Sequence, residues 1–169
     1  MPNDPVAANF LAFAVRRMEL SERDINCCLD RLTSDQMLYR GGDNENSIAN
    51  LLLHLAGNLR QWILHGIDGQ PDVRTRDDEF SLALELPLPE IRARFAATLA
   101  ECRAVITAIP HDRMLTIIDP QPNGGWGRAT ILEAVFLVVG HLQLHTGQII
   151  LLTKQLTHAD LDLSIPRKR

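Results

Sequence analysis

Residues 129–150 read ATILEAVFLVVGHLQLHTGQII and contain most of the longest apolar segment of the chain. Thr130 and Glu133 have the spacing of a capping box, in which each side chain bonds a backbone amide that the first helical turn leaves free. The residues that follow are apolar on nearly every side of a helix. We therefore predict one long helix from this point to about Leu156.

Three earlier segments have the periodicity of amphipathic helices. They run roughly from Val6 to Leu32, from about Ser47 to His65, and from near Pro89 to Ile109. Alternating patterns typical of strands are missing, apart from the short segment from Met114 to Ile118. In the first helix, the expected core residues are Phe10, Phe13, Met18, Ile25, Leu29 and Leu32.

Four helices of this length, each with an apolar face, predict an all-α fold with a four-helix bundle as its closed core. The 169 residues fit a single domain that spans positions 1–169. Two connections are long, at residues 67–88 and 111–129. Because the first is long enough to return along the bundle, we expect a crossover between the second and third helices.

Charge and cysteine content exclude several classes of protein. The net charge is −4, and the basic run Pro166-Arg167-Lys168-Arg169 is typical of a solvated chain end, so we expect no nucleic-acid partner. Three cysteines, two of them adjacent, make no disulfide framework and indicate a cytoplasmic setting. The N-terminal residues do not resemble a signal peptide, and polar residues interrupt the long apolar segment. We therefore expect a soluble protein with no membrane partner.

The apolar segment carries two histidines, His141 and His145, four residues apart. Residues with this spacing lie on one face of a helix, about 6 Å apart at Cβ, so both imidazoles can reach one metal ion. The zincin motif is excluded because Leu142 occupies the position of its general-base glutamate. Taken alone, the pair has a more ordinary interpretation, as two helix histidines bonded to water or to neighbouring side chains.

His54 lies in LLLHLAG, an apolar run near the middle of the second helix. A lone histidine there is more often a core residue with a hydrogen-bond partner. All three histidines occupy mid-helix positions, however, so they could meet inside the bundle and bind a divalent ion. Three neutral ligands leave a coordination position open, as in catalytic sites; zinc or nickel suits them best, and iron, cobalt or manganese also fits. A di-iron carboxylate site is excluded because neither helix has an inward Glu-x-x-His pattern.

These features resemble the DinB/YfiT-like superfamily, in particular its DUF1572-type branch. The resemblance rests on residues 46–63, 74–80 and 129–150, with a histidine in the second helix and an HxxxH followed by GQI in the fourth. It implies a four-helix bundle with a crossover, a homodimer, and a metal site with His54, His141 and His145 as ligands. Characterised members of the superfamily include S-transferases that use bacillithiol or mycothiol and a mycothiol-dependent maleylpyruvate isomerase. Many members, including this branch, have no known reaction.

Two amide residues beside the histidines could support the site. Gln148 shares the face of His141 and His145 and could bond the outer nitrogen of a ligand or a bound water. It could equally be a polar residue at a bundle or dimer seam. Asn58, four residues after His54, has the same two interpretations.

Three arginines could hold an anionic substrate or a thiol cofactor at the mouth of the site, namely Arg60, Arg74 and Arg76. For the two loop arginines, we favour ion pairs with acidic residues of the same loop, which are Asp72, Asp77 and Asp78.

The sequence thus predicts a metal-binding protein and leaves three interpretations of its function. We favour a metal-dependent enzyme that acts on a small molecule, either as a thiol-dependent S-transferase or as a hydrolase. The alternative is a non-catalytic, stress-related dimeric bundle that binds a metal or a small ligand. In the third interpretation, the histidines are buried polar residues of a structural bundle that binds no metal.

Overall fold

The computed structural model describes residues 4–84, 86–119, 121–122 and 127–163. Every regular element in these ranges is helical, and the only bridge of strand type among them pairs Ile117 with Thr130. The all-α prediction is therefore confirmed. The basic run at residues 166–169 lies outside the described residues.

Four long helical segments make up most of the molecule. They are α1 (Pro5–Leu29), α3 (Ile48–Leu59) with its continuation η1 (Arg60–His65), α4 (Leu88–Ala108) and α5 (Ile131–Thr157). Three shorter elements connect them, namely α2 (Ser34–Leu38), η2 (Asp77–Phe80) and η3 (His111–Arg113).

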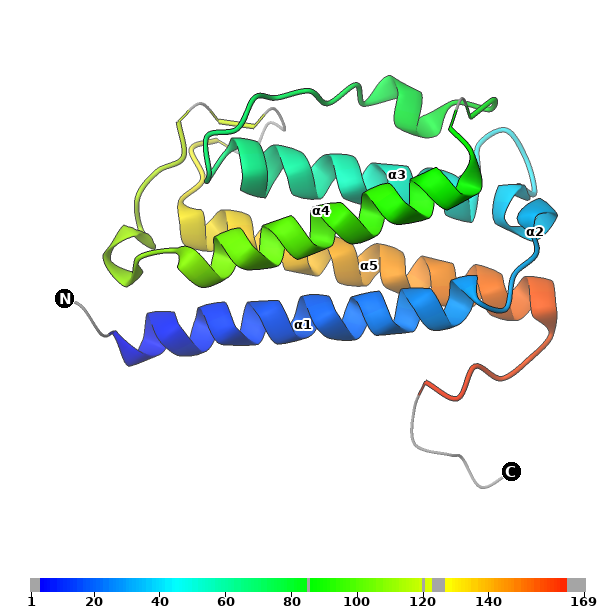
Figure 1. The fold of residues 1–169 in the computed structure, drawn as a ribbon, viewed down its shortest axis with the longest axis horizontal. Helices are drawn as coiled ribbons and strands as arrows, with labels where there is room; N and C mark the ends of the chain where they lie inside the picture. Colours follow the sequence, from blue (N-terminus) through cyan, green and yellow to red (C-terminus); the bar gives the residue numbers. More distant parts are fainter. Residues whose placement is uncertain (1–3, 85, 120, 123–126, 164–169) are drawn as a thin grey trace.

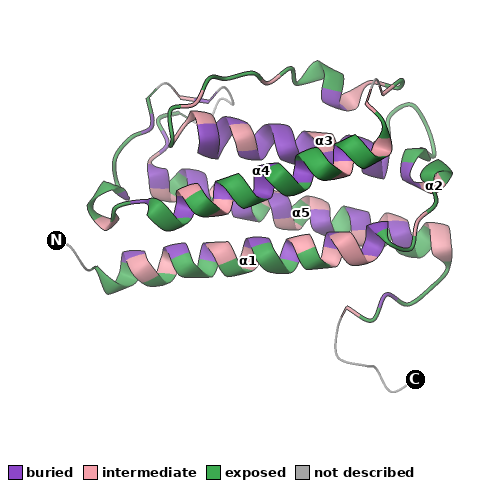
Figure 2. Cartoon of the chain, viewed as in Figure 1, coloured by how far each residue is buried: buried purple, intermediate pink, exposed green. Residues whose placement is uncertain are grey.

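The long helices lie side by side, with α1 packed on α4 and α5, and α3 packed on the same two helices (Figure 1). α1 and α5 run in one direction, and α3 and α4 run in the other (Figure 1). α3 and α4 can share a direction because the segment between them runs back along the whole length of α3. Figure 2 shows that α3 is buried on nearly all sides, whereas α1 and α4 have an exposed outer face.

Local sequence explains where the helices begin. Ser47 caps α3 and Thr130 caps α5, each in a capping box with the residue three positions later. Asn50, the partner of Ser47, also donates from Nδ2 to the carbonyl oxygens of Glu79 and Ser81 at 2.9 and 3.1 Å. The start of α3 therefore holds the segment that carries η2 against the helix.

The first predicted helix needs three corrections. It ends at Leu29, and the chain then forms α2, a short helix that the sequence pattern did not predict. Phe13 was expected in the core but is 54% exposed, because it lies on the outer face of α1. Phe10 and Leu32 are only partly buried, whereas Met18, Ile25 and Leu29 are core residues as predicted.

The second predicted helix has the expected length, but its last part differs in geometry. From Arg60 to His65 the chain forms a π-helix, and Gly66 follows its end. A Cβ at Gly66 would lie 2.7 Å from the backbone oxygen of Trp62, so a larger residue does not fit there.

One described helix, α5, is long and apolar enough to cross a membrane when only length and composition are considered. The core helix of a soluble protein passes the same test, so this result is weak evidence for a membrane span.

Candidate metal centre

The three predicted histidines come together between α3 and α5. Nε2 of His141 lies 3.1 Å from Nε2 of His54 and 3.0 Å from Nε2 of His145. Ligand atoms of all three lie within 4.8 Å of one another. The rings meet edge to face, with centroids 4.4–5.1 Å apart. His54 is buried, and the two α5 histidines are partly exposed.

Hydrogen bonds to the outer nitrogens orient two of these rings. Nδ1 of His54 lies 2.9 Å from Oε2 of Glu79, and Nδ1 of His145 lies 2.6 Å from Oε1 of Gln148. Since both partners present acceptor oxygens, each Nδ1 carries the proton in the neutral imidazole. The lone pairs of both Nε2 atoms then point toward His141.

Hydrogen bonds among the three rings cannot satisfy all three Nε2 atoms. His141 has a single ring proton when neutral, so its Nε2 can donate to only one of the two facing lone pairs. Its Nδ1 is buried without a hydrogen-bond partner among the described residues. A cation placed among the three Nε2 atoms would satisfy all of them at once.

The spacing of the nitrogens fits a metal ion. Two imidazole nitrogens bound at about 2.0–2.1 Å are separated by about 2.9 Å on an octahedral ion and about 3.3 Å on a tetrahedral one. The two separations that involve His141, 3.0 and 3.1 Å, lie between these values, and the ligand atoms of His54 and His145 lie within 4.8 Å of each other. The three-histidine group can therefore hold a divalent ion.

Glu79, the partner of His54, is fixed by Arg74. Nε and Nη2 of Arg74 donate to the two carboxylate oxygens at 2.7 and 2.8 Å, in a bidentate pair. Nη1 of Arg74 donates to Gln61 at 2.9 Å, and Gln61 donates to Asp72 at 3.0 Å. The Arg74–Glu79 pair is buried, with side chains 7% and 8% exposed. The orientation of His54 thus depends on a chain of polar contacts from η1 and the following loop.

A glycine makes room for this carboxylate. A Cβ at Gly57 would lie 1.9 Å from Oε1 of Glu79, which is far inside contact distance. Gly57 follows His54 by three positions, so it occupies a neighbouring part of the α3 surface. The absence of a side chain there lets η2 approach the helix closely enough for Glu79 to reach His54.

The ionisation of these groups suits cation binding. Burial, together with the charges of His145 and His54, lowers the pKa of His141 to about 4. Burial also lowers the pKa of His145. Burial alone would raise the pKa of Glu79, but hydrogen bonds from Arg74 and His54 outweigh it and leave that pKa below its ordinary value. At neutral pH, the imidazoles of His141 and His145 are therefore neutral and free to bind a cation, and the carboxylate of Glu79 is ionised.

The other predicted site residues have mixed outcomes. Gln148 contacts the outer nitrogen of His145, which is the first of its two predicted roles. Asn58 is buried, and its Oδ1 has no hydrogen-bond partner among the described residues. Arg60 contacts Gln70 at 3.4 Å and no histidine of the cluster.

The expected partners of the loop arginines were largely wrong. Arg74 pairs with Glu79, and its only contact with Asp72 runs from its backbone amide to the carboxylate at 3.1 Å. Arg76 lies over the ring of Phe80, at 4.9 Å from the centroid. Phe80 in turn packs on His54, with centroids 4.9 Å apart.

Two residues of the site, Glu79 and Gly57, were not predicted from the sequence. Nothing in RTRDDEF distinguishes Glu79 from the two aspartates before it, because only the turn of η2 directs one of the three inward. A usable signal did exist for Gly57. Glycine in the middle of a helix lowers the stability of the helix by about 1 kcal/mol relative to alanine. Its presence therefore indicates that another segment of the chain or a ligand approaches the helix closely there.

Two comparisons with known proteins bear on identity. No curated protein sequence matches the chain. A family model described as the DinB superfamily matches residues 17–149, which include all three histidines and most of every long helix. The chain therefore belongs to the DinB superfamily.

Proposed function

We propose that His54, His141 and His145 bind one divalent metal ion, with zinc or nickel as the preferred ions. The observation that carries the proposal is the convergence of three Nε2 atoms whose outer nitrogens, in two of the three rings, are already bonded to acceptors. Such outer contacts are typical of metal-ligating histidines, since they fix the tautomer and the direction of the ring.

We further propose that the protein is a metal-dependent enzyme that acts on a small molecule, as a thiol-dependent S-transferase or as a hydrolase. Three protein ligands leave a position for an exogenous group, and the two α5 histidines are partly exposed. A divalent ion held there would act as a Lewis acid and lower the pKa of a thiol or water molecule that reached it. The Arg74–Glu79 pair keeps the His54 ring directed at this position.

Metal analysis of the purified chain tests the binding proposal. We expect about one divalent ion per chain, and its loss in His54→Ala and in His145→Ala. His158→Asn is the matched control, because His158 caps the end of α5 in a left-handed conformation that asparagine tolerates. A metal-free wild-type chain that also fails to bind added zinc, nickel, cobalt, iron(II) or manganese would contradict the proposal.

A second candidate function is non-catalytic binding of a metal or small ligand, in a stress-related role. One observation favours it: Glu79, the carboxylate that contacts the cluster, is already bonded to Arg74 and His54 and has no free oxygen for proton transfer. Metal-dependent conjugation of an electrophile with glutathione, bacillithiol or mycothiol would support the transferase. Metal binding without turnover of these thiols or of ester and amide substrates would support the second function.

We also propose that the four long helices form the crossover four-helix bundle of the DUF1572-type branch and assemble as a homodimer through α5. The exposed side of α5 carries Phe136, Leu144 and Leu151, which are 71%, 61% and 57% exposed. Gly140 and Gly147 belong to the same helix, and a Cβ added at either would meet no atom within 4 Å. Large apolar residues beside glycines give a second helix a surface that it can approach closely.

A further inference from the structure

A cavity of about 280 Å³ lies between α3, α4 and the segment that contains η2. None of the three histidines lines it. It shares only Gly57, Arg74 and Glu79 with the surroundings of the metal centre. Its volume is near the lower end of the range of small-molecule sites, about 300–1,000 Å³. The cavity thus adjoins the metal centre through these three residues, but the histidines themselves do not line it.

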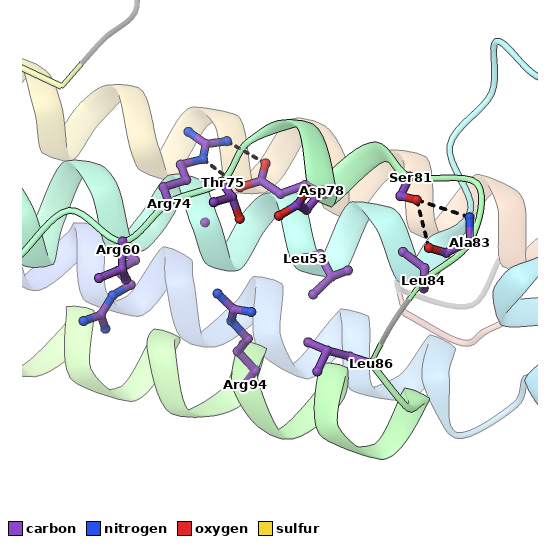
Figure 3. Close-up of a pocket in the computed structure, with 13 residues that line it drawn as sticks. Leu53, Arg60, Arg74, Thr75, Asp78, Ser81, Ala83, Leu84, Leu86 and Arg94 are labelled. Atoms are coloured by element: carbon purple, nitrogen blue, oxygen red, sulfur yellow. Dashed lines mark hydrogen bonds and ion pairs between the residues drawn. The ribbon is translucent and has the colours of Figure 1, made fainter.

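The lining of the cavity combines arginines with a group of leucines (Figure 3). Arg60 lies at one end and Leu84 at the other, and Arg94 lies between them, on the side of Leu53 and Leu86. An arginine beside a group of leucines complements a ligand with an anionic head and an apolar tail.

Arg60 and the exposed Arg94 both have donors that no described residue engages. Nε of Arg60 is buried without a hydrogen-bond partner, and its one contact, to Gln70, is long at 3.4 Å. Arg94 makes no hydrogen bond or ion pair with any residue that the structure describes. Arg74 differs, because Glu79 and Gln61 already engage its guanidinium.

The net charge of the lining favours a monoanion. Three arginines and two carboxylates, Asp78 and Glu79, face the cavity, which leaves one positive charge in excess. Since Arg74 and Glu79 neutralise each other, the remaining groups are Arg60 and Arg94 against Asp78. Asp78 lies on the side of the η2 segment, between Thr75 and Leu53 in Figure 3. A doubly charged head group would be repelled by this carboxylate, whereas a single carboxylate matches the one positive charge in excess.

We propose that this cavity binds an amphipathic monocarboxylate, with its head group on Arg94 and its tail against Leu53, Leu84 and Leu86. The site is distinct from the metal centre and does not depend on a bound metal. Its ligand would lie against Arg74 and Glu79, and these two residues also orient His54.

Calorimetric titration of the full chain with octanoate, octan-1-ol and octylamine tests the proposal. We expect octanoate to bind more tightly than the alcohol and the amine. Arg94→Gln should weaken octanoate binding about tenfold and leave octan-1-ol unchanged, because it removes a charge-assisted hydrogen bond. Leu86→Trp should weaken binding of both, since it fills the apolar part of the cavity.

Two controls make the result specific. Arg92→Gln removes a cation two positions away on α4 that bonds Asn26 and Asp30 and does not line the cavity, so octanoate affinity should stay as in the wild type. His145→Ala should also keep octanoate binding, which separates this proposal from the metal-binding one. Equal affinity for octanoate and octan-1-ol in the wild-type chain would overturn the proposal, as would unchanged octanoate affinity in Arg94→Gln.

Discussion

Glu79 joins the buried ion pair with Arg74 to the orientation of His54. Its two oxygens divide these tasks: Oε1 accepts from Arg74, and Oε2 accepts from both Arg74 and His54. A change at this one residue should therefore affect folding and metal binding together.

Glu79→Gln should lower metal affinity about 10–100-fold, the usual effect of removing the outer partner of a ligating histidine. It should also lower the free energy of unfolding by about 3 kcal/mol, because it leaves the Arg74 charge buried without its partner. Competition with a metal chelator and urea unfolding measure the two effects. Glu22→Gln, which removes the partner of the more exposed Arg103, is the control and should cost less than about 1 kcal/mol.

Gly57→Ala should displace Glu79 from His54, because the new methyl group would lie 1.9 Å from Oε1. Alanine is favoured over glycine in a helix by about 1 kcal/mol, so a net loss of stability would mark the clash. We expect reduced metal content and a lower midpoint of urea unfolding. Gly42→Ala, where nothing lies within 4 Å of the added carbon, should change neither quantity. A stabilised Gly57→Ala variant with full metal content would contradict this account.

At the scale of elements, α5 has two separate roles on two faces. One face directs His141 and His145 toward His54, and another exposes large apolar side chains. The periodicity of the sequence could not separate these faces, because α5 is apolar on both its core side and its exposed side.

Leu144→Glu should convert the proposed homodimer into a monomer, since it places a charge in the middle of the exposed apolar face of α5. Light scattering coupled to size-exclusion chromatography measures the mass. The matched control is Leu115→Glu, at a similarly exposed leucine that lies outside α5. A wild-type chain that is monomeric at high concentration, or a dimeric Leu144→Glu variant, would count against the α5 interface.

At the scale of the whole molecule, the metal-free protein should lose stability as the pH falls. The unfolded chain takes up a proton at His141 near its ordinary pKa of 6.5, whereas the folded chain does so only near a pKa of about 4. Below pH 6.5 the unfolded state therefore binds more protons, and the free energy of unfolding decreases until about pH 4. His145 adds to the effect with the same sign.

We expect the loss to be about 1–2 kcal/mol between about pH 7.5 and pH 5, since partial solvent exposure reduces it. Urea unfolding after treatment with a chelator measures it. His141→Leu should show a smaller dependence on pH, and His158→Asn should keep that of the wild type. An equally steep dependence in His141→Leu would assign the effect to other groups.

The sequence by itself determined the all-α fold and the bounds of three of the four long helices to within a few residues, and it identified the three histidines as candidates for one site. Capping residues and apolar periodicity are local signals, so they identify α3, α4 and α5 directly. The end of α1, the separate α2 and the exposed side of Phe13 depended on which face met other helices, and those contacts are not local.

Only the tertiary structure decided what surrounds the histidines. Asn50 holds the η2 segment on α3, Gly57 gives it room, and the turn of η2 then directs Glu79 inward. The sequence shows three acidic residues in a row and cannot say which of them is buried. Burial of a carboxylate requires partners, and Arg74 and His54 become its partners only when the returning segment lies along α3.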